Sequence, residues 1–248
     1  MVRYKIGVTE AGDAGLDLSW EPYLGRVDGA VLITKNITPS FHDAALRNLD
    51  KAILHATMTG YGGSVLEPEV PLVERQMEAV LRLVRDGFPM EKVVARIDPI
   101  IPTPKGIGQA RCVFQMALDA GLTRFRVSVV DMYPCTRERF RRAGLPLPYG
   151  PKGFSPSRRQ LAAVDAMLEG ILFQHPGIRV ESCAEPRLIA PIQCGCVSAY
   201  DLALLGLDDK EADSAGYQRR GCLCYSGKEE LLSRKAQCEH GCLYCYWR

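Results

Sequence analysis

No excess of either charge marks this sequence. Lysine and arginine total 31 residues against 29 aspartates and glutamates, which gives a formal net charge of +2. A balance this close provides none of the single-sign field that draws proteins to nucleic acids or anionic membranes. Such a role would therefore need a local patch of charge.

Long apolar runs are missing as well. No stretch approaches the roughly 20 apolar residues that a membrane-spanning helix needs. The opening segment MVRYKIGVTEAG has no charged region followed by an apolar one, which is the pattern of a secretory leader. Low-complexity tracts and internal repeats are also missing, which excludes solenoid architectures. We therefore expect a soluble, cytoplasmic protein with no membrane partner.

The sequence does contain enough apolar residues for a full core. Hydrophobic residues make up 47% of its 248 positions. Short apolar runs rich in β-branched residues recur, each followed by a helical or loop segment, as in parallel sheets covered by helices. The clearest helix is predicted over PLVERQMEAVLRLVRDG. The alternation favours a βα-repeat barrel or an open doubly wound sheet. The six predicted strands are YKIGV, GAVLIT, AILHATMT, KVVARID, FRVSVV and IRVES.

Polar residues follow most of these predicted strands. In βα barrels the carboxyl ends of the strands converge on one face, where binding and catalytic groups lie. This pattern favours a barrel with a polar mouth, although ordinary strand-to-loop residues would look similar. The residues concerned are Thr34, Lys35, Asn36, Thr57, Thr59, Tyr61, Arg96, Asp98, Ser128, Asp131, Tyr133, Glu181, Cys183 and Glu185.

Ten cysteines are the most unusual feature of the composition. In a reducing cytosol, clustered cysteines indicate metal binding or redox chemistry rather than disulfides. The segment CEHGCLYCYWR carries Cys238, Cys242 and Cys245 in a CxxxCxxC spacing. Three thiolates leave one coordination position of a metal or cluster open, and a ligand can bind there.

This spacing, with Tyr244 just before the last cysteine, resembles the cluster loop of radical S-adenosylmethionine enzymes. The resemblance implies a [4Fe–4S] cluster on the three cysteines, S-adenosylmethionine on the fourth iron and a partial (β/α)6 barrel. It also implies a 5′-deoxyadenosyl radical that takes hydrogen from a substrate. In that superfamily the loop usually follows the first strand. Its position here, after the last predicted strand, would require a circularly permuted barrel.

A second resemblance covers nearly the whole chain. The segments LITKN, TMTGYGGSVLEPEVP, ARIDPIIPT, VVDMY, SCAEP and CEHGCLYCYW occur in this order and look like the bacterial domain of unknown function 1848 family. That family shows an apparent affinity to radical S-adenosylmethionine and photolesion-repair lyase proteins. The sequence departs from the family near its start, where TEAGDAGLDLSW replaces an opening rich in arginine, threonine and aspartate and only Asp13 corresponds.

Four further cysteines fall where the family tends to have cysteine: Cys183, Cys196, Cys222 and Cys224. Four thiolates would complete the shell of an auxiliary iron–sulfur cluster, which we favour, or of a structural zinc ion. Cys194 has no counterpart in the family and is either a spare cysteine or an alternative ligand. Cys112 lies on an apolar helical face and is predicted to be buried.

Two basic runs suggest a second kind of partner. Arg137, Arg139, Arg141 and Arg142 form one, and Arg219 with Arg220 forms the other. They could bind a substrate phosphate or a nucleic-acid backbone, but solvated helix faces are the commoner explanation. The expected partners are a small-molecule or nucleotide substrate, a nucleic acid as a further candidate, and a reductant such as flavodoxin or ferredoxin.

The leading hypothesis is thus a radical S-adenosylmethionine enzyme, an oxidoreductase or a lyase. Residues 1–192 would form the barrel, and residues 193–248 a cysteine-rich extension packed on it. Two alternatives stay open: a non-catalytic zinc-binding module and an iron–sulfur electron-transfer protein. The cofactor-binding candidates are Lys35, Asn36, Thr59, Arg96, Glu185 and Tyr244, and the catalytic candidates are Asp98, Asp131 and Tyr133.

Overall fold

The computed structural model describes residues 4–207, 223–232 and 238–246. Within them the fold is mixed α/β, built on one parallel sheet of eight strands in the order β7-β6-β5-β4-β3-β2-β1-β8. The strands are β1 (Ile6–Val8), β2 (Gly29–Thr34), β3 (Ala52–Thr57), β4 (Val93–Ile100), β5 (Arg124–Val129), β6 (Arg179–Cys183), β7 (Ile192–Cys194) and β8 (Lys228–Glu230).

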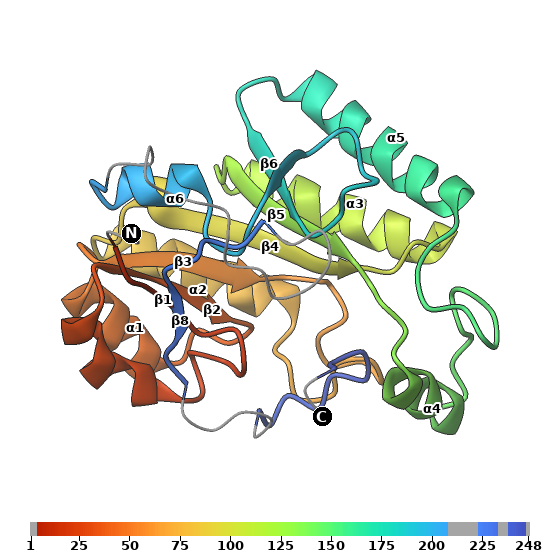
Figure 1. The fold of residues 1–248 in the computed structure, drawn as a ribbon, viewed down its shortest axis with the longest axis horizontal. Coiled ribbons are helices and arrows are strands. Elements are labelled where there is room, and N and C mark those ends of the chain that lie inside the picture. The colour runs from red at the N-terminus through yellow and green to blue at the C-terminus, as the bar shows by residue number, and fades with distance from the viewer. Residues whose placement is uncertain (1–3, 208–222, 233–237, 247–248) are drawn as a thin grey trace.

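All six strands predicted from the sequence are present, as β1 to β6. The sheet is curled, with most helices along its outer side, which is consistent with a partial barrel (Figure 1). The helices are η1 (Leu18–Arg26), α1 (Pro39–Arg47), α2 (Val73–Arg85), η2 (Met90–Lys92), α3 (Pro104–Asp119), α4 (Pro134–Arg142), α5 (Arg158–Gln174) and α6 (Ala199–Leu204).

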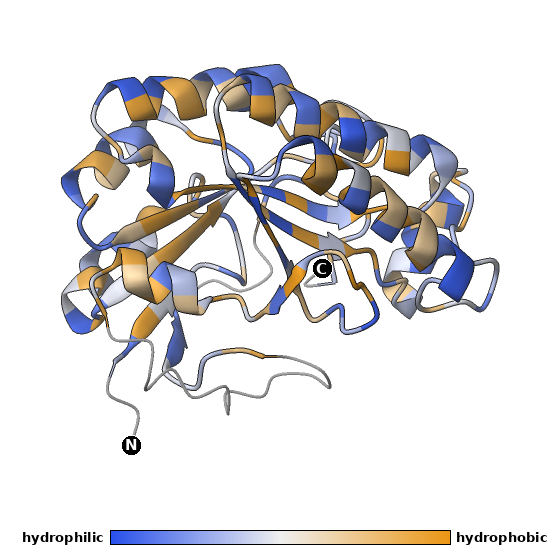
Figure 2. Cartoon of the chain, turned by 90° about the horizontal axis from the view of Figure 1, so that it is seen from above, coloured by the Kyte–Doolittle hydropathy of each residue, from blue (hydrophilic) through white to orange (hydrophobic). Residues whose placement is uncertain are grey.

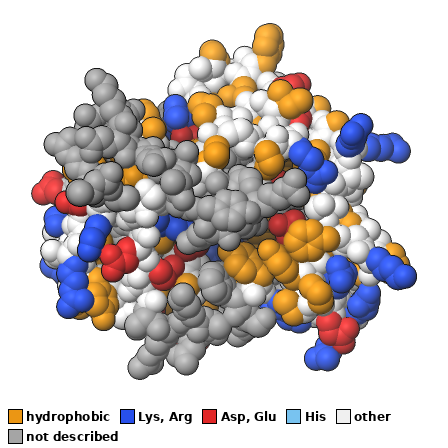
Figure 3. Space-filling view, viewed as in Figure 1, with side chains coloured by type: hydrophobic (Ala, Val, Ile, Leu, Met, Phe, Trp, Pro, Cys, Tyr) orange, Lys and Arg blue, Asp and Glu red, His pale blue; other side chains and the backbone are white. Residues whose placement is uncertain are grey.

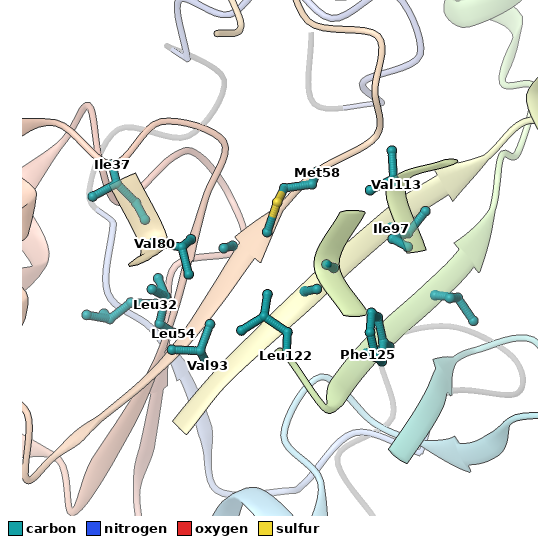
Figure 4. Packing of buried hydrophobic residues seen from close by; sticks show 14 of the residues in the cluster. Leu32, Ile37, Leu54, Met58, Val80, Val93, Ile97, Val113, Leu122 and Phe125 are labelled. Atoms are coloured by element: carbon teal, nitrogen blue, oxygen red, sulfur yellow. The ribbon is translucent and has the colours of Figure 1, made fainter. Parts of the chain in front are cut away.

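Side chains that alternate along the strands build two apolar layers. On β2, Leu32 packs in the cluster between sheet and helices, which also contains Val80 of α2 and Val113 of α3 (Figure 4). Its neighbour Val31 faces the opposite side, in a cluster with Leu202 of α6. Both faces of these strands are therefore covered, which explains their nearly continuous apolar sequences (Figure 2).

Local sequence determines where the helices begin. Thr38 and Thr103 cap α1 and α3, and each is followed by proline, whose fixed φ suits the first helical position. Ser157 caps α5 in a capping box with Gln160. The prediction that Cys112 is buried was wrong: it lies on the exposed side of α3, next to the buried Val113.

The segments after Pro191 complete the sheet on both sides. β7 pairs with β6, and β8 pairs with β1, so these two short strands are the edges of the described sheet. Val197, Leu202 and Tyr225 fill the inner face against β1 to β4. Division of the chain into residues 1–192 and 193–248 stays a prediction. No helix among the described residues is long and apolar enough to cross a membrane.

A buried charge network lies on the same inner face. Arg124 donates to Asp201 over 2.6 Å, and Arg126 donates to Glu181 over 2.8 Å and to Asp201 over 3.4 Å. Beside them, burial and the positive charge of Arg126 hold the pKa of His55 well below its usual value, so this histidine is neutral. His55 is fully buried, and neither of its ring nitrogens has a hydrogen-bond partner among the described residues.

Candidate functional site

A cavity of about 420 Å³ lies where the carboxyl ends of the strands converge. This volume is in the range of roughly 300–1,000 Å³ that is typical of small-molecule sites. Residues that follow or end six successive strands line it, as the pattern of polar strand ends predicts. They include Glu10 and Asp13 after β1, Thr34 and Lys35 at β2, Thr57 of β3, Arg96 and Asp98 of β4, Ser128 and Asp131 at β5, and Cys183 of β6.

The segment Cys238–Tyr246 closes one side of this cavity. Its His240 is buried, and the Nε2 atom lies 2.8 Å from Oδ2 of Asp13. Asp13 is held in turn by the Thr34 hydroxyl and by the backbone N–H of Lys35. Although burial opposes it, these hydrogen bonds and the facing imidazole keep the pKa of Asp13 below its usual value. The terminal segment is thereby fastened to the ends of β1 and β2.

A second anchor holds Tyr244. The Nζ of Lys35 donates to the Tyr244 hydroxyl over 2.9 Å and to Oε1 of Glu67 over 2.8 Å, and Tyr244 itself donates to Glu67. Thr59 donates to the other carboxylate oxygen of Glu67 over 2.7 Å. Backbone bonds add to this attachment, from Glu69 to His240 and from Leu243 to Leu66. These contacts fix the segment Cys238–Tyr246 against Lys35 and against residues 59–69.

All three terminal cysteines, Cys238, Cys242 and Cys245, line the cavity. Burial raises the pKa of Cys242 to about 12, and the nearby Lys35 partly opposes this shift. In the described residues no group of three or more His, Cys, Asp or Glu side chains is placed to hold a single metal ion.

Arg96, Asp98 and Ser128 form a polar group on the cavity wall. Arg96 and Ser128 both donate to the Asp98 carboxylate. Despite burial, the Arg96 charge and these hydrogen bonds keep the pKa of Asp98 below its usual value. Asp98 is therefore an ionised carboxylate that is already partnered.

Three of the four cysteines predicted as a second ligand set also meet at this cavity. The Sγ of Cys196 lies 3.6 Å from that of Cys183 and 3.7 Å from that of Cys224. Cys183 ends β6 and is followed by Ala184, whose φ of 55° is unusual for a residue with a side chain. The fourth, Cys222, lies outside the described residues.

Glu10 and Cys196 are hydrogen-bonded to each other in this cluster. The Cys196 thiol lies 2.8 Å from Oε1 of Glu10, and the Nζ of Lys228 donates to Oε2 over 2.7 Å. Burial, together with the adjacent Cys196, raises the pKa of Glu10 to about 7. Hydrogen bonds from Cys183 and Cys224 lower the pKa of Cys196.

The other predicted site residues divide into two sets. The cavity wall contains Lys35, Arg96, Asp98, Asp131, Tyr133 and Tyr244. The lining does not include Asn36, Thr59 or Glu185. Thr59 instead donates a hydrogen bond to Glu67, and Glu185 accepts a hydrogen bond from the backbone N–H of Val129. None of these placements tests a catalytic or cofactor-binding role, so those roles stay predictions.

Sequence reasoning missed the contacts that Glu10, Glu67 and Lys228 make around the candidate site. Glu10 follows β1 just as Lys35 follows β2, so the same strand-end pattern could have found it. Glu67 stands in the quoted segment GYGGSVLEPE, but no local pattern shows that it will meet a residue 177 positions away. Lys228 begins β8, a strand too short and too polar to be recognised from its sequence.

The basic run on α4 is largely occupied by contacts within the protein. Arg137 donates to the carbonyl of Met132, Arg139 to that of Cys245 and Arg141 to that of Pro151, while Arg142 pairs with Glu138. Lys and Arg side chains are visible over this corner of the molecule in Figure 3. The other basic run, Arg219 and Arg220, lies outside the described residues. Nucleic-acid binding stays a prediction.

One protein family matches most of this chain. The family model described as "Domain of unknown function (DUF1848)" matches residues 21–247, which is most of the sequence. The chain belongs to this family. The matched region includes β2 to β8 and the whole CxxxCxxC segment, whereas β1, Glu10 and Asp13 precede it. No curated protein matches the sequence.

Proposed function

We propose that this protein is a radical S-adenosylmethionine enzyme. The observation that carries the proposal is the position of Cys238, Cys242 and Cys245 on the wall of the cavity where the strand ends converge. Three thiols beside a substrate-sized cavity suit a cluster with one open iron. A structural clasp or an electron-transfer site needs no such cavity.

The three cysteines would hold the [4Fe–4S] cluster. When bound, this cluster supplies the electron that cleaves S-adenosylmethionine and gives the 5′-deoxyadenosyl radical that takes hydrogen from substrate. The protein's own contribution is to fix the thiols in place. The contacts between Tyr244, Lys35 and Glu67 and between His240 and Asp13 do this, because each ties the terminal segment to residues that follow a strand.

The location of His240 supports a partial (β/α)6 barrel with permuted chain order. In the superfamily the cluster loop usually follows the first strand, and here the loop arrives from the other end of the sequence. Its His240 contacts Asp13, which comes shortly after β1. The terminal segment thus lies beside the carboxyl end of the first strand, as the cluster loop of the superfamily does, although it comes from the other end of the sequence.

Charged groups of both signs line the cavity and would contact oppositely charged groups of a ligand. Lys35 and Arg96 provide cations, and Asp98 and Asp131 provide carboxylates. We propose that these groups, with Tyr133, orient S-adenosylmethionine and a small-molecule or nucleotide substrate, and that Asn36, Thr59 and Glu185 support them from behind. The cavity volume fits a single small molecule better than a nucleic-acid duplex. A flavodoxin or ferredoxin is the proposed reductant, and the net reaction would be that of an oxidoreductase or a lyase.

Electron paramagnetic resonance of the anaerobic, dithionite-reduced protein tests the proposal. We expect a reduced [4Fe–4S] signal that shifts when S-adenosylmethionine is added, and a Cys242→Ser variant that loses this signal. Cys112→Ser is the matched control, because Cys112 is exposed on α3, and it should behave as the wild type. Zinc without sulfide would instead identify a zinc-binding module, and a signal indifferent to S-adenosylmethionine an electron-transfer protein.

A further inference from the structure

The cluster of Cys183, Cys196 and Cys224 has a geometry of its own, separate from the terminal cysteines. Cys196 is central, with sulfur–sulfur distances of 3.6 Å to Cys183 and 3.7 Å to Cys224. These are contact distances between thiols. A disulfide bond brings its sulfurs to about 2.0 Å. Either pair could therefore bond after closing by roughly 1.6 Å.

The sulfur contacts are closer than those around an iron–sulfur cluster. An iron–sulfur cluster stands between its thiolates and keeps them out of direct contact. A single ion needs at least three ligands that converge on it, and the described residues include no such group. The predicted fourth ligand, Cys222, lies outside the described residues. Cys196 is therefore placed to react with either Cys183 or Cys224.

Polar neighbours prepare Cys196 for such a reaction. Its thiol donates to Oε1 of Glu10 over 2.8 Å, and Lys228 donates to the other oxygen of that carboxylate over 2.7 Å. Lys228 also lies 3.6 Å from the sulfur of Cys224. A nucleophile beside a carboxylate that a third group orients is the arrangement found around activated thiols and hydroxyls.

The cluster is open to the cavity although its residues are buried. Cys183, Cys196, Cys224 and Glu10 all line the cavity. Cys194, only two residues from Cys196, does not line it, and its thiol donates to the backbone carbonyl of Ser182. A small reagent in the cavity can therefore reach Cys196 but not Cys194.

From this geometry we propose that Cys196 is the nucleophile of a redox-active dithiol centre, with Cys183 or Cys224 as its resolving partner, that exchanges two electrons with a small organic disulfide in the cavity. The proposal uses none of the terminal cysteines, so it stands apart from the proposed function. It assigns to these thiols a role other than the auxiliary cluster or zinc site predicted from the sequence.

The reaction has two steps. Cys196 attacks one sulfur of the disulfide, so a mixed disulfide forms and one thiol leaves with the proton of Cys196. Cys183 or Cys224 then attacks the Cys196 sulfur, the mixed bond breaks, and the second thiol leaves with the other proton. The protein is oxidised by two electrons, and the organic disulfide is reduced to two thiols.

The test is to incubate the anaerobic, full-length protein with bis(2-hydroxyethyl) disulfide and to map its disulfide bonds by mass spectrometry after non-reducing digestion. We expect a bond between Cys196 and Cys183 or Cys224, formed at least tenfold faster than any adduct at Cys194. The wild-type measurement needs no variant and so does not depend on whether substituted proteins fold. Metal content is measured on the same sample before oxidation.

Variants then separate the roles of the thiols. Cys196→Ser should abolish the internal bond, whereas Cys194→Ser, at a neighbouring position that does not line the cavity, should leave its rate unchanged. Cys183→Ser or Cys224→Ser should leave only the other pair. The proposal is overturned if no bond to Cys196 forms, or if these thiols are protected by iron or zinc that is lost in Cys196→Ser. That second result would instead establish the metal centre predicted from the sequence.

Discussion

Two buried carboxylates in this protein each accept hydrogen bonds from several side chains, and the local sequence does not predict these contacts. Glu67, for example, joins the nearby Thr59 to Lys35 and Tyr244, which lie 32 and 177 positions away from it in the sequence. Asp201 does the same on the inner face of the sheet, where Ser198, Arg124 and Arg126 all donate to it. These carboxylates are buried, and their contribution to the free energy of unfolding depends on the charged groups that face them.

Substitution of Asp201 should strongly destabilise the fold. Asp201→Asn removes the charge that faces Arg124 and Arg126 and leaves two guanidinium groups buried without it. We expect the free energy of unfolding at pH 7 to fall by about 3 to 5 kcal/mol. Urea denaturation of both proteins measures this. Asp50→Asn, at an exposed position, is the control and should change stability by no more than about 0.5 kcal/mol.

The pH dependence of this loss follows from the pKa of Asp201. Burial opposes ionisation, but the charges of Arg126 and Arg124 outweigh it and hold the folded-state pKa of Asp201 below the usual value. The stabilisation is therefore complete above the unfolded pKa of about 4 and is lost as the pH falls through the folded value. The difference between wild type and Asp201→Asn should shrink below about pH 4. A difference that stays constant down to pH 3 would contradict this assignment.

At the scale of elements, the long apolar segments were predictable and the short polar ones were not. The six predicted strands appear as β1 to β6 because each buries apolar side chains on two faces. β7 and β8 have three residues each, IQC and KEE, and form only because a neighbouring strand edge offers hydrogen bonds. Such long-range pairing leaves no local pattern in the sequence.

The same holds for the candidate site. Strand-end polarity located Lys35, Arg96 and Asp98 on the cavity wall. The contacts of the terminal segment could not be predicted, since His240 and Asp13 are 227 positions apart. The prediction for Cys112 failed because the apolar face of α3 is centred on Val113 and Phe114, which leaves the adjacent cysteine outside.

The start of α5 offers a test at this scale. Two serines, Ser155 and Ser157, precede this helix, and in the structure the Ser157 hydroxyl accepts the N–H of Gln160. Ser157→Ala should therefore lower the free energy of unfolding by about 1 kcal/mol. Ser155→Ala, at an exposed position two residues earlier, is the matched control and should be nearly neutral. Equal effects in thermal unfolding would show that the cap is not where the contacts place it.

At the scale of the whole molecule, the curled sheet brings two groups of cysteines to one cavity. Strand ends, the terminal segment and the segments on either side of β7 and β8 all contribute to its wall. The terminal group is held by side chains that follow β1 and β2, whereas the thiols Cys183, Cys196 and Cys224 touch one another.

The cleavage of S-adenosylmethionine itself is the most direct test of the proposed function. The protein is reconstituted anaerobically with iron and sulfide, reduced with dithionite and incubated with S-adenosylmethionine, and the products are measured by liquid chromatography and mass spectrometry. We predict that 5′-deoxyadenosine and methionine form in equal amounts, that Cys242→Ala reduces this at least a hundredfold, and that Cys112→Ala leaves it unchanged. A protein that carries a full four-iron cluster and forms no 5′-deoxyadenosine would contradict the account.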